Sequence, residues 1–369
     1  MNGKMVRQIT TGDYDVTKLY GVDEANKMVY FQSAEQSPLG RQIYSIDMDG
    51  NNKKNLTPTA GTNSAQFSST FDYFVNTFST ANTPPVFTVY DRNGKAVRVI
   101  EDNKKLVTVQ ETYGAQKVNF FKIKNAIGDE LNAWSVKPPN YDASKKYPVL
   151  MYVYGGPGSQ TVKDSYGYNN YWWFQMLAQK GYIVVSVDNR GTGARGEQFK
   201  KMTYQQLGKY ETEDQITAAK YLANLPYVDK DRIGIFGWSY GGYMSSLAIL
   251  KGNDVFKAAI AVAPVTNWKW YDSIYTERYM RTDDENPAGY KENSPVYFAD
   301  QLKGNYLLVH GNADDNVHFQ NSAEMAKALI KANKQFDTYF YPNRNHGIFG
   351  DNARLHLYDK MTDFLMEKL

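Results

Sequence analysis

Residues 237–243 read GWSYGGY and directly follow the apolar run IGIF at 233–236. An apolar strand, a sharp turn with one serine at its apex and a helix start rich in small residues fit the G-x-S-x-G nucleophile elbow. Glycines are needed around Ser239 because such a turn presses neighbouring backbone against the serine. The stretch therefore predicts a serine hydrolase. The alternative interpretation is that Ser239 is only a small residue in a tight turn.

From about residue 130 the pattern alternates between strands and helices. Nearly continuous apolar runs, typical of parallel strands covered on both faces, lie at 149–154, 183–187, 233–236, 258–262 and 306–310, with a late strand at 336–341. Helices are expected at 211–225, 320–333 and 354–368. The first of these helices has acids in its first turn and places Ile216, Ala219 and Ala223 on one apolar face. This order, with the serine elbow in its middle, predicts the doubly wound sheet of an α/β-hydrolase over residues 101–369.

Residues 1–100 carry a weak internal repeat. The segment 43–50 aligns with 87–94 at an offset of 44, and 28–31 aligns with 72–75. Each unit reads strand, loop, strand, turn, strand, and a period near 44 with short strands is typical of a β-propeller blade. The alternative is two unrelated hairpins. Two blades cannot close a propeller, which typically has at least about four, so we expect residues 1–100 to be the last blades of a truncated propeller.

Composition excludes several classes of function. The net charge of the 369 residues is only +3 with both signs mixed along the chain, so no nucleic-acid partner is expected. The absence of cysteine excludes disulfides, cysteine-based zinc sites and thiol catalysis. The four histidines form no H-x-x-x-H pair, so we expect no metal site. The sequence contains no run of 18 apolar residues, so no membrane span is predicted. The first residues lack the apolar core of a signal peptide.

A serine hydroxyl needs a base to take its proton, and the base needs an acid to hold its tautomer. In α/β-hydrolases these residues follow in the order Ser, Asp or Glu, then His. Asp314 and Asp315 come just after the strand at 306–310, and His346 lies in a Gly- and Asn-rich loop after the strand at 336–341. Both loops follow the carboxyl ends of parallel strands, so they are expected at the same rim as Ser239.

The local sequence leaves alternatives open for both partners. Either aspartate could orient the base while the other caps the following helix. His318 is the main competitor of His346, because His310 falls in a predicted buried strand and His356 in the last helix.

A tetrahedral oxyanion needs hydrogen-bond donors. One donor is expected to be the backbone N–H of Tyr240, the residue after the nucleophile. A second should come from the loop after the first central strand, where residues 152–158 read YVYGGPG. The hydroxyl of Tyr154 could itself donate there. The alternative for Tyr154 is a core aromatic at a strand end.

Six motifs together carry a family resemblance: GWSYGGY, HGNADDNVHFQ, NHG, VYGGPGSQ, DNRGTGARG and, most specifically, VAPVTNWKWYDSIYTERYM. They resemble the dipeptidyl peptidase IV branch of the prolyl oligopeptidase family, over nearly all of residues 100–369. The resemblance implies Ser239 as nucleophile, Asp314 as acid, His346 as base, and Tyr154 as the oxyanion donor beside the Tyr240 amide.

The resemblance also implies a pocket for the substrate residue before the cut bond, which is typically proline. A flat, apolar ring without an N–H suits aromatic walls. Asn316 matches a residue that contacts a substrate carbonyl. Without the family, these aromatics would read as core. The implied wall residues are Tyr240, Val265, Trp268, Tyr271, Tyr275 and Val317.

The implied activity is a serine exopeptidase that releases N-terminal dipeptides after proline or alanine, without a metal or organic cofactor. The family reads the substrate's amino end with paired glutamates on the propeller, yet no Glu-Glu occurs in this sequence. We therefore expect a C-terminal fragment, weakly active by itself, of an exported enzyme whose signal or anchor precedes it. A homodimer is also expected from the resemblance.

Two other functions compete with this reading. One is a broader oligopeptidase, acylaminoacyl peptidase or esterase of the same fold, against which the YDSIYTERYM stretch argues. The other, from a different class, is a non-catalytic binding module, although the sequence carries every part that catalysis needs.

Overall fold

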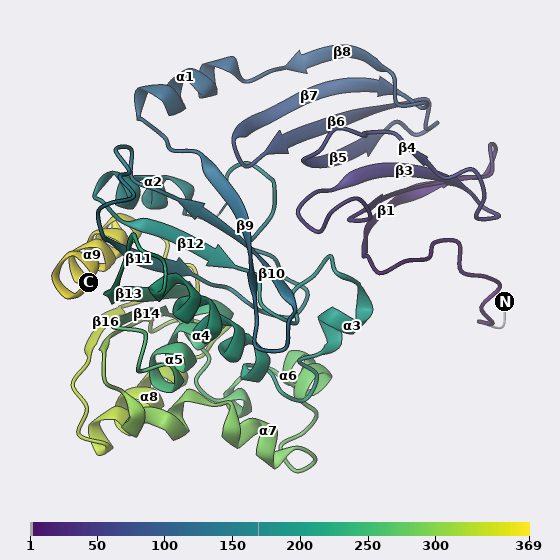
Figure 1. The fold of residues 1–369 in the computed structure, drawn as a ribbon. Helices are drawn as coiled ribbons and strands as arrows, with labels where there is room; N and C mark the ends of the chain where they lie inside the picture. The colour runs from purple at the N-terminus through teal and green to yellow at the C-terminus, as the bar shows by residue number, and fades with distance from the viewer. Residues whose placement is uncertain (1–2, 169) are drawn as a thin grey trace. The chain divides into compact units, whose positions relative to one another are not determined.

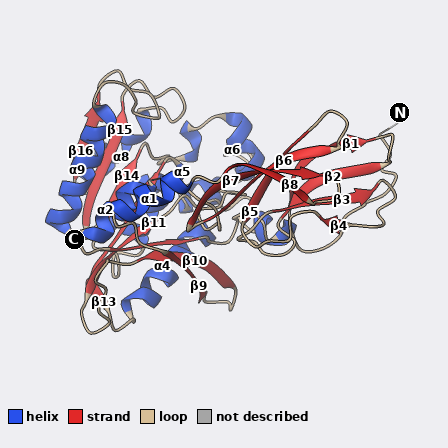
Figure 2. Cartoon of the chain, turned by 90° about the horizontal axis from the view of Figure 1, so that it is seen from above, coloured by secondary structure: helices blue, strands red, loops and turns tan. Residues whose placement is uncertain are grey.

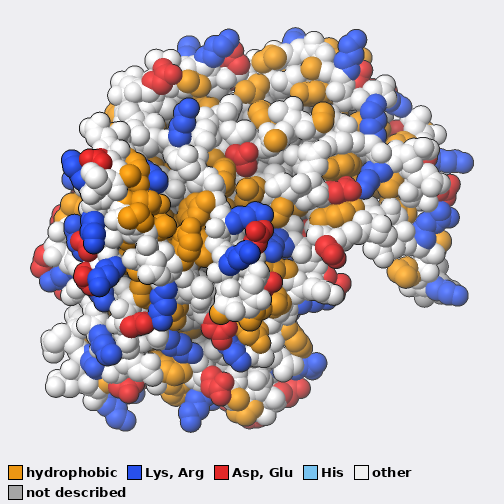
Figure 3. Space-filling view, viewed as in Figure 1, with side chains coloured by type: hydrophobic (Ala, Val, Ile, Leu, Met, Phe, Trp, Pro, Cys, Tyr) orange, Lys and Arg blue, Asp and Glu red, His pale blue; other side chains and the backbone are white. Residues whose placement is uncertain are grey.

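The computed structural model describes residues 3–168 and 170–369; the first two residues of the predicted propeller segment and Asn169 lie outside it. The chain divides into two compact units. Unit 1 comprises Met1–Val118, Lys163–Tyr171 and Gly193–Lys200, and unit 2 comprises Asn119–Val162, Trp172–Thr192 and Lys201–Leu369. Within the described residues, no helix combines the length and apolar character that crossing a membrane requires. On the face drawn in Figure 3, basic and acidic side chains are interspersed.

Unit 1 contains two four-stranded antiparallel sheets (Figure 1). The first sheet has the order β1 (Val16–Asp23), β2 (Met28–Ser33), β3 (Gln42–Asp47) and β4 (Lys54–Asn55), and the second has β5 (Thr62–Phe67), β6 (Tyr73–Thr80), β7 (Thr83–Asp91) and β8 (Ala96–Glu101). Helix α1 (Lys104–Thr112) and nearly all of α3 (Gly196–Lys201) also belong to this unit.

The predicted repeat is visible in the turns of the two sheets. The N–H of Gly50 donates to the carbonyl of Asp47 at 2.8 Å, and 44 residues later the N–H of Gly94 donates to Asp91 at 3.0 Å. Both glycines have positive φ, 83° and 79°, which a side chain would strain. The propeller-blade interpretation is therefore confirmed, and each blade has one strand more than the sequence indicated, β1 and β5.

The two sheets of unit 1 share a core. Side chains from both sheets form one buried cluster: Tyr30, Ile43, Leu56, Ala65 and Phe74. The rings of Tyr30 and Phe67, one from each sheet, lie 4.8 Å apart. Burial of large aromatic surface is the main stabilising contribution at such a junction.

Unit 2 is built on one eight-stranded sheet with the order β16-β15-β14-β13-β11-β12-β10-β9. Its strands are β9 (Val118–Lys124), β10 (Glu130–Val136), β11 (Tyr147–Tyr152), β12 (Ile183–Val187), β13 (Val228–Trp238), β14 (Ala258–Val262), β15 (Asn305–Gly311) and β16 (Asp337–Tyr341). Strands β11 to β16 pair in parallel, as predicted. Strands β9 and β10 were not predicted from the sequence. Strand β10 pairs antiparallel with β12.

Helices cover both faces of this sheet, which confirms the doubly wound α/β-hydrolase architecture (Figures 1 and 2). On one face, the indole N–H of Trp173 in α2 donates to the hydroxyl of Thr362 in α9 at 2.9 Å. The opposite face carries α4, α5 and α8. The helical segments of unit 2 are α2 (Tyr171–Gln179), α4 (Lys209–Ala223), α5 (Tyr240–Lys251), α6 (Ser273–Met280), α7 (Pro287–Glu292), α8 (Gln320–Lys331), α9 (Ala353–Lys368), and the short turns η1 (Trp268–Trp270) and η2 (Pro295–Gln301).

The orientation of α4 departs from the apolar face that the sequence indicated. Ala219 is buried as predicted, but Ile216 and Ala223 are only half-buried, and the buried stripe includes the polar residues Glu211, Asp214 and Gln215. The physical reason is that all three side chains find polar partners inside the unit, which offset part of the cost of their burial. Oε2 of Glu211 and Oε1 of Gln215 have no such partner among the described residues. Hydrophobic periodicity cannot reveal such partners.

The junction between β13 and α5 leaves no room for side chains. A Cβ placed on Gly241 would lie 2.2 Å from the carbonyl oxygen of Val153, and one on Gly237 would lie 2.2 Å from the carbonyl oxygen of Gly241. These obstacles are backbone atoms, which cannot rotate away. The start of α5 therefore packs directly against the end of β11.

We predict that Gly241→Ala greatly lowers the free energy of unfolding or prevents folding, because the new methyl group overlaps the Val153 carbonyl. The measurement is urea unfolding followed by circular dichroism. Gly128→Ala is the matched control, since a Cβ there meets nothing within 4 Å; its positive φ should cost only about 1 kcal/mol. Equal effects of the two substitutions would contradict the packing described.

Candidate active site

Ser239 lies between the end of β13 and the first residue of α5. Its backbone has φ 60° and ψ −119°, a conformation rarely adopted by residues with a side chain. Its N–H donates to the carbonyl of Val262 on the neighbouring strand at 2.8 Å. Backbone strain of this kind costs about 1–3 kcal/mol and persists where the surroundings fix it, commonly at functional sites. The geometry is that of a nucleophile elbow.

Asp314 lies in the turn after β15, with a side chain that is fully buried. Its Oδ2 accepts from Nδ1 of His346 at 2.7 Å, and its Oδ1 accepts from the backbone N–H groups of Asn316 and Val317, both at 2.9 Å. Burial alone would raise the pKa of this carboxyl. Hydrogen bonds from His310, His346 and the backbone outweigh burial, so the pKa of Asp314 lies well below its ordinary value.

The same geometry separates the alternatives that the sequence left open. Asp315 is exposed, and α8 begins without a side-chain cap. His318 is exposed, and His356 has its Nδ1 2.9 Å from the hydroxyl of Tyr341. Of His318, His346 and His356, only His346 contacts Asp314, and His310 in β15 contacts the same carboxylate.

The contact with Asp314 also fixes the tautomer of His346. A carboxylate only accepts hydrogen bonds, so Nδ1 of His346 carries a proton. In the neutral ring, Nε2 then has a free lone pair and can act as a base. The imidazole is 24% exposed, which leaves it accessible.

Hydrogen bonds join the loops that carry these three residues. The indole N–H of Trp238, directly before Ser239, donates to the backbone carbonyl of His346 at 3.0 Å. The N–H of Ala313, directly before Asp314, donates to the carbonyl of Arg344 at 3.1 Å. The loops after β13, β15 and β16 therefore meet at one rim of the sheet.

Two tyrosines lie beside the elbow. The Tyr240 ring is buried, and its hydroxyl donates to Oε1 of Glu211 at 2.7 Å. Tyr154 follows β11, and its ring centroid lies 6.0 Å from that of Tyr240. Burial raises the pKa of the Tyr154 hydroxyl, with a further contribution from Tyr279, so the phenol keeps its proton at neutral pH. Its O–H is therefore available as a donor.

The predicted pocket aromatics form one contiguous cluster. Trp268 lies 5.6 Å from Tyr240, 6.0 Å from Tyr271 and 5.9 Å from Tyr275, measured between ring centroids. The Tyr271 hydroxyl donates to Oδ1 of Asn316 at 3.1 Å. The cluster is thereby connected to the loop that holds Asp314.

The two predicted valines are both buried. Val317 adjoins Asp314 through its backbone N–H. Val265 follows β14 and lies three residues before Trp268 in the chain.

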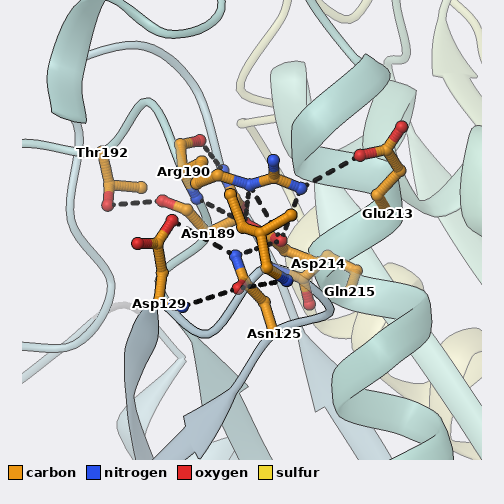
Figure 4. A network of polar contacts seen from close by, with 9 residues as sticks. Asn125, Asp129, Asn189, Arg190, Thr192, Glu213, Asp214 and Gln215 are labelled. Carbon is orange, nitrogen blue, oxygen red and sulfur yellow. Dashed lines mark hydrogen bonds and ion pairs between the residues drawn. The ribbon is translucent and has the colours of Figure 1, made fainter. Parts of the chain in front are cut away.

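A polar network joins α4 to the turn at Asn189 and Arg190 (Figure 4), and this turn supports the loop that follows Tyr154. Gln215 donates to Oδ1 of Asn189 at 3.1 Å. The amide of Asn189 donates to the carbonyl of Gly155 at 3.0 Å. Gly155 has φ 78°, and a Cβ there would lie 2.7 Å from Oδ1 of Asn189. The side chain of Asn189 thus fixes the residue next to Tyr154.

A buried ion pair anchors this network. The Nε of Arg190 lies 3.0 Å from both oxygens of Asp214, and the two side chains are only 6% and 1% exposed. Asn125 also donates to Oδ1 of Asp214 at 3.2 Å, and Glu213 receives a second bond from Arg190 at 3.0 Å (Figure 4). Removing one partner would leave an uncompensated buried charge, so the pair holds α4 against the 189–190 turn.

Sequence reasoning missed three polar residues around this site: Glu211, Asn189 and His310. Burial raises the pKa of Glu211 to about 7, although backbone amides and the Tyr240 hydroxyl donate to it. The signal that could have found Glu211 is its position one helical turn before Gln215 on the same face as Asp214. The sequence shows His310 only as a rival of His346, whereas in the structure both histidines contact Asp314.

The sheet and the elbow at Ser239 define an α/β-hydrolase. The sequence model of the prolyl oligopeptidase family matches residues 168–369, and that of the dipeptidyl peptidase IV (DPP IV) N-terminal region matches residues 1–85. The chain therefore belongs to the prolyl oligopeptidase family, in its dipeptidyl peptidase IV branch.

Individual relatives agree with this assignment. Prolyl endopeptidase FAP of Mus musculus is 39% identical over 98% of this chain and 48% of its own length, and a probable dipeptidyl-aminopeptidase B of Botryotinia fuckeliana is 39% identical over 97% and 39%. A crystal structure of Porphyromonas gingivalis dipeptidyl peptidase 4 superposes with a TM-score of 0.95 at 50% identity, covering 100% of this chain and 52% of that one. The chain thus spans about half the length of these relatives, or less.

We predict that Glu211→Gln changes how stability depends on pH. The raised pKa means that the folded state keeps the proton of Glu211 longer than the unfolded state, so this group's stabilisation is present at acidic pH and is lost as pH rises through about 7. Between pH 5 and pH 8 the wild type should lose about 2–3 kcal/mol from this group, and the Gln variant should not.

The measurement is urea unfolding at pH 5, 6, 7 and 8. Glu213→Gln is the control on the same helix, because its side chain is 51% exposed. Parallel stability curves for the wild type and Glu211→Gln would contradict the raised pKa of the buried Glu211 carboxyl.

Proposed function

We propose that this chain carries the catalytic site of a serine peptidase that cleaves after proline or alanine. The observation that carries the proposal is the 2.7 Å contact between His346 and the buried Asp314, beside an elbow that presents Ser239. An acid, a base with a free Nε2 and a strained serine are the parts that acyl transfer requires.

The chemistry would proceed in two halves. Nε2 of His346 takes the proton of Ser239 while Oγ bonds to the substrate carbonyl carbon. His346 then gives that proton to the leaving amine as the C–N bond breaks, leaving an acyl-enzyme. Water attacks the ester, His346 takes the proton from the water and returns it to Ser239, and the acid product leaves. Asp314 stays ionised and stabilises the imidazolium.

Two donors are proposed for the oxyanion. The backbone N–H of Tyr240 lies at the N-terminus of α5, where the helix dipole also favours negative charge. The second is the Tyr154 hydroxyl, which holds its proton at neutral pH. Each donor stabilises the negative charge that develops on the substrate carbonyl oxygen in the transition state, so loss of a single donor lowers kcat strongly.

The aromatic cluster supports a preference for proline before the cut bond. Tyr240, Trp268, Tyr271 and Tyr275 offer apolar ring faces to a flat side chain without an N–H, and we propose that Val265 and Val317 complete the pocket wall. Asn316 has its amide oxygen engaged by Tyr271, so its N–H2 group is the one suited to donate to a substrate carbonyl. Release of dipeptides from the amino end is our leading proposal.

A second candidate is cleavage within a chain after proline. It is favoured by the 39% identity to a relative named prolyl endopeptidase. The two activities differ in whether the substrate needs a free amino terminus. Broader oligopeptidase, acylaminoacyl peptidase or esterase activity would accept substrates without proline.

The test has two parts. A fluorophosphonate should label Ser239 of this chain and leave Ser239→Ala unlabelled, as read by intact mass; an unlabelled, folded wild type would contradict the proposed nucleophile. On the intact protein, Ala-Pro-p-nitroanilide should be cleaved and its N-acetylated form should not. Equal cleavage of both would support the endopeptidase instead.

We predict that Tyr154→Phe lowers kcat by about 10²- to 10³-fold with little change in KM, because only the oxyanion donor is lost. The measurement is steady-state hydrolysis of the proline amide. Tyr221→Phe serves as control, since Tyr221 is exposed on α4. An unchanged kcat for Tyr154→Phe would exclude the hydroxyl from the oxyanion site.

Three further proposals remain. First, the internal repeat and the alternation of strands and helices support a catalytic domain at residues 101–369 after propeller blades in 1–100. The second and third rest on the family resemblance: the protein forms a homodimer, and it is exported. Light scattering on the purified protein measures the second, and fractionation of the source cells measures the third. A monomeric mass or a cytosolic location would contradict the corresponding proposal.

A further inference from the structure

His310 is a second imidazole on the carboxylate of Asp314. It is the penultimate residue of β15, and its side chain is fully buried. Its Nε2 lies 3.1 Å from Oδ2 of Asp314, the same oxygen that His346 contacts, and 2.8 Å from the carbonyl oxygen of Val317. Its Nδ1 lies 2.7 Å from the hydroxyl of Ser322.

These partners determine where the proton of His310 resides. A carboxylate oxygen and a carbonyl oxygen are both acceptors, so the nitrogen between them must carry hydrogen. The Ser322 hydroxyl can donate or accept, and it can therefore serve an unprotonated Nδ1. The neutral tautomer that satisfies every contact has its proton on Nε2 and accepts from Ser322 at Nδ1.

The charge balance of the site favours this neutral form. Of the titratable groups, Asp314 lies 3.1 Å from His310, and His346 contacts the same carboxylate. In the proposed reaction His346 becomes positively charged, so the single negative charge of Asp314 is already balanced by the His346 imidazolium. A second imidazolium in a fully buried position would lack a counter-charge, which is strongly unfavourable. The ring of Phe319 packs edge-on against the imidazole of His310, with the two ring centroids 5.7 Å apart.

We propose that His310 is a positioning residue for the reaction: as a neutral Nε2–H donor it fixes Oδ2 of Asp314, so that this oxygen faces Nδ1 of His346 before the base accepts a proton. The proposal rests on the proposed function. Oδ1 is already held by two backbone amides. With His310 on Oδ2, the carboxylate cannot rotate about its Cβ–Cγ bond without losing a donor.

The same ring also ties the triad to the predicted pocket. The backbone of Val317 gives its N–H to Asp314 and its carbonyl to His310. Asp314, His310 and Val317 therefore form one closed set of hydrogen bonds. A shift of the pocket loop would disturb the acid that orients His346.

The first test is a spectroscopic measurement that needs no catalysis. In the ¹⁵N-labelled chain, long-range ¹H–¹⁵N correlation spectra of the four histidine rings report which nitrogen carries hydrogen. His310, assigned by the loss of its signals in His310→Gln, should be neutral with the proton on Nε2. A proton on Nδ1 alone, or a doubly protonated ring at pH 7.5, would overturn the proposal.

The second test compares two variants. His310→Gln keeps an N–H donor near the position of Nε2, whereas His310→Leu removes it. We expect the Leu variant to react with a fluorophosphonate at Ser239 about 10- to 100-fold more slowly, by analogy with the loss of partners that orient metal-bound histidines. The Gln variant should recover most of the rate. The Nδ1–H resonance of His346 should move in the Leu variant and stay near its wild-type position in the Gln variant.

The outcomes separate the two proposals. A wild type that is unreactive at Ser239 but has the expected His310 tautomer contradicts the proposed function and leaves the donor role standing. A Leu variant that reacts as fast as the wild type, with an unchanged His346 resonance, overturns the positioning role. If the Leu variant does not fold, the tautomer in the wild type decides.

Discussion

The structure of the site depends on one buried anion. Asp314 has no exposed side-chain surface, yet it is surrounded by donors: two backbone amides on Oδ1 and the imidazoles of His346 and His310 on Oδ2. Without them burial would raise the pKa of this carboxyl, because a low-dielectric surrounding disfavours its charge. With them it is an anion of fixed orientation, and that orientation determines which nitrogen of His346 can act as a base.

Helix α4 supplies the second constraint. Its buried face is polar: Glu211 accepts from Tyr240, while Asp214 and Gln215 hold the turn at Asn189 and Arg190 (Figure 4). Within that turn, the side-chain amide of Asn189 donates to the carbonyl of Gly155, the neighbour of Tyr154. The positions of both proposed oxyanion donors, Tyr240 and Tyr154, therefore depend on α4. A hydrogen-bonded polar network of this kind rigidifies the core and specifies one arrangement.

Much of this could be predicted from the sequence, and the exceptions have physical causes. Apolar runs located the parallel strands, and GWSYGGY located the elbow, because close backbone packing demands glycine at 237 and 241. The buried face of α4 and the contact of His310 could not be predicted, since both depend on partners distant in sequence. Strands β9 and β10 could not be predicted from apolar runs, because polar residues interrupt both of their sequences, VNFFKIK and ELNAWSV.

The most direct measurement of the central claim is a crystal structure of the free protein, read at the Oγ of Ser239 and the Nε2 of His346. The account predicts that these two atoms lie within hydrogen-bonding distance, with Nδ1 of His346 still on Asp314. An imidazole far from Ser239, in a loop that stays there when an organophosphonate is bound, would contradict it.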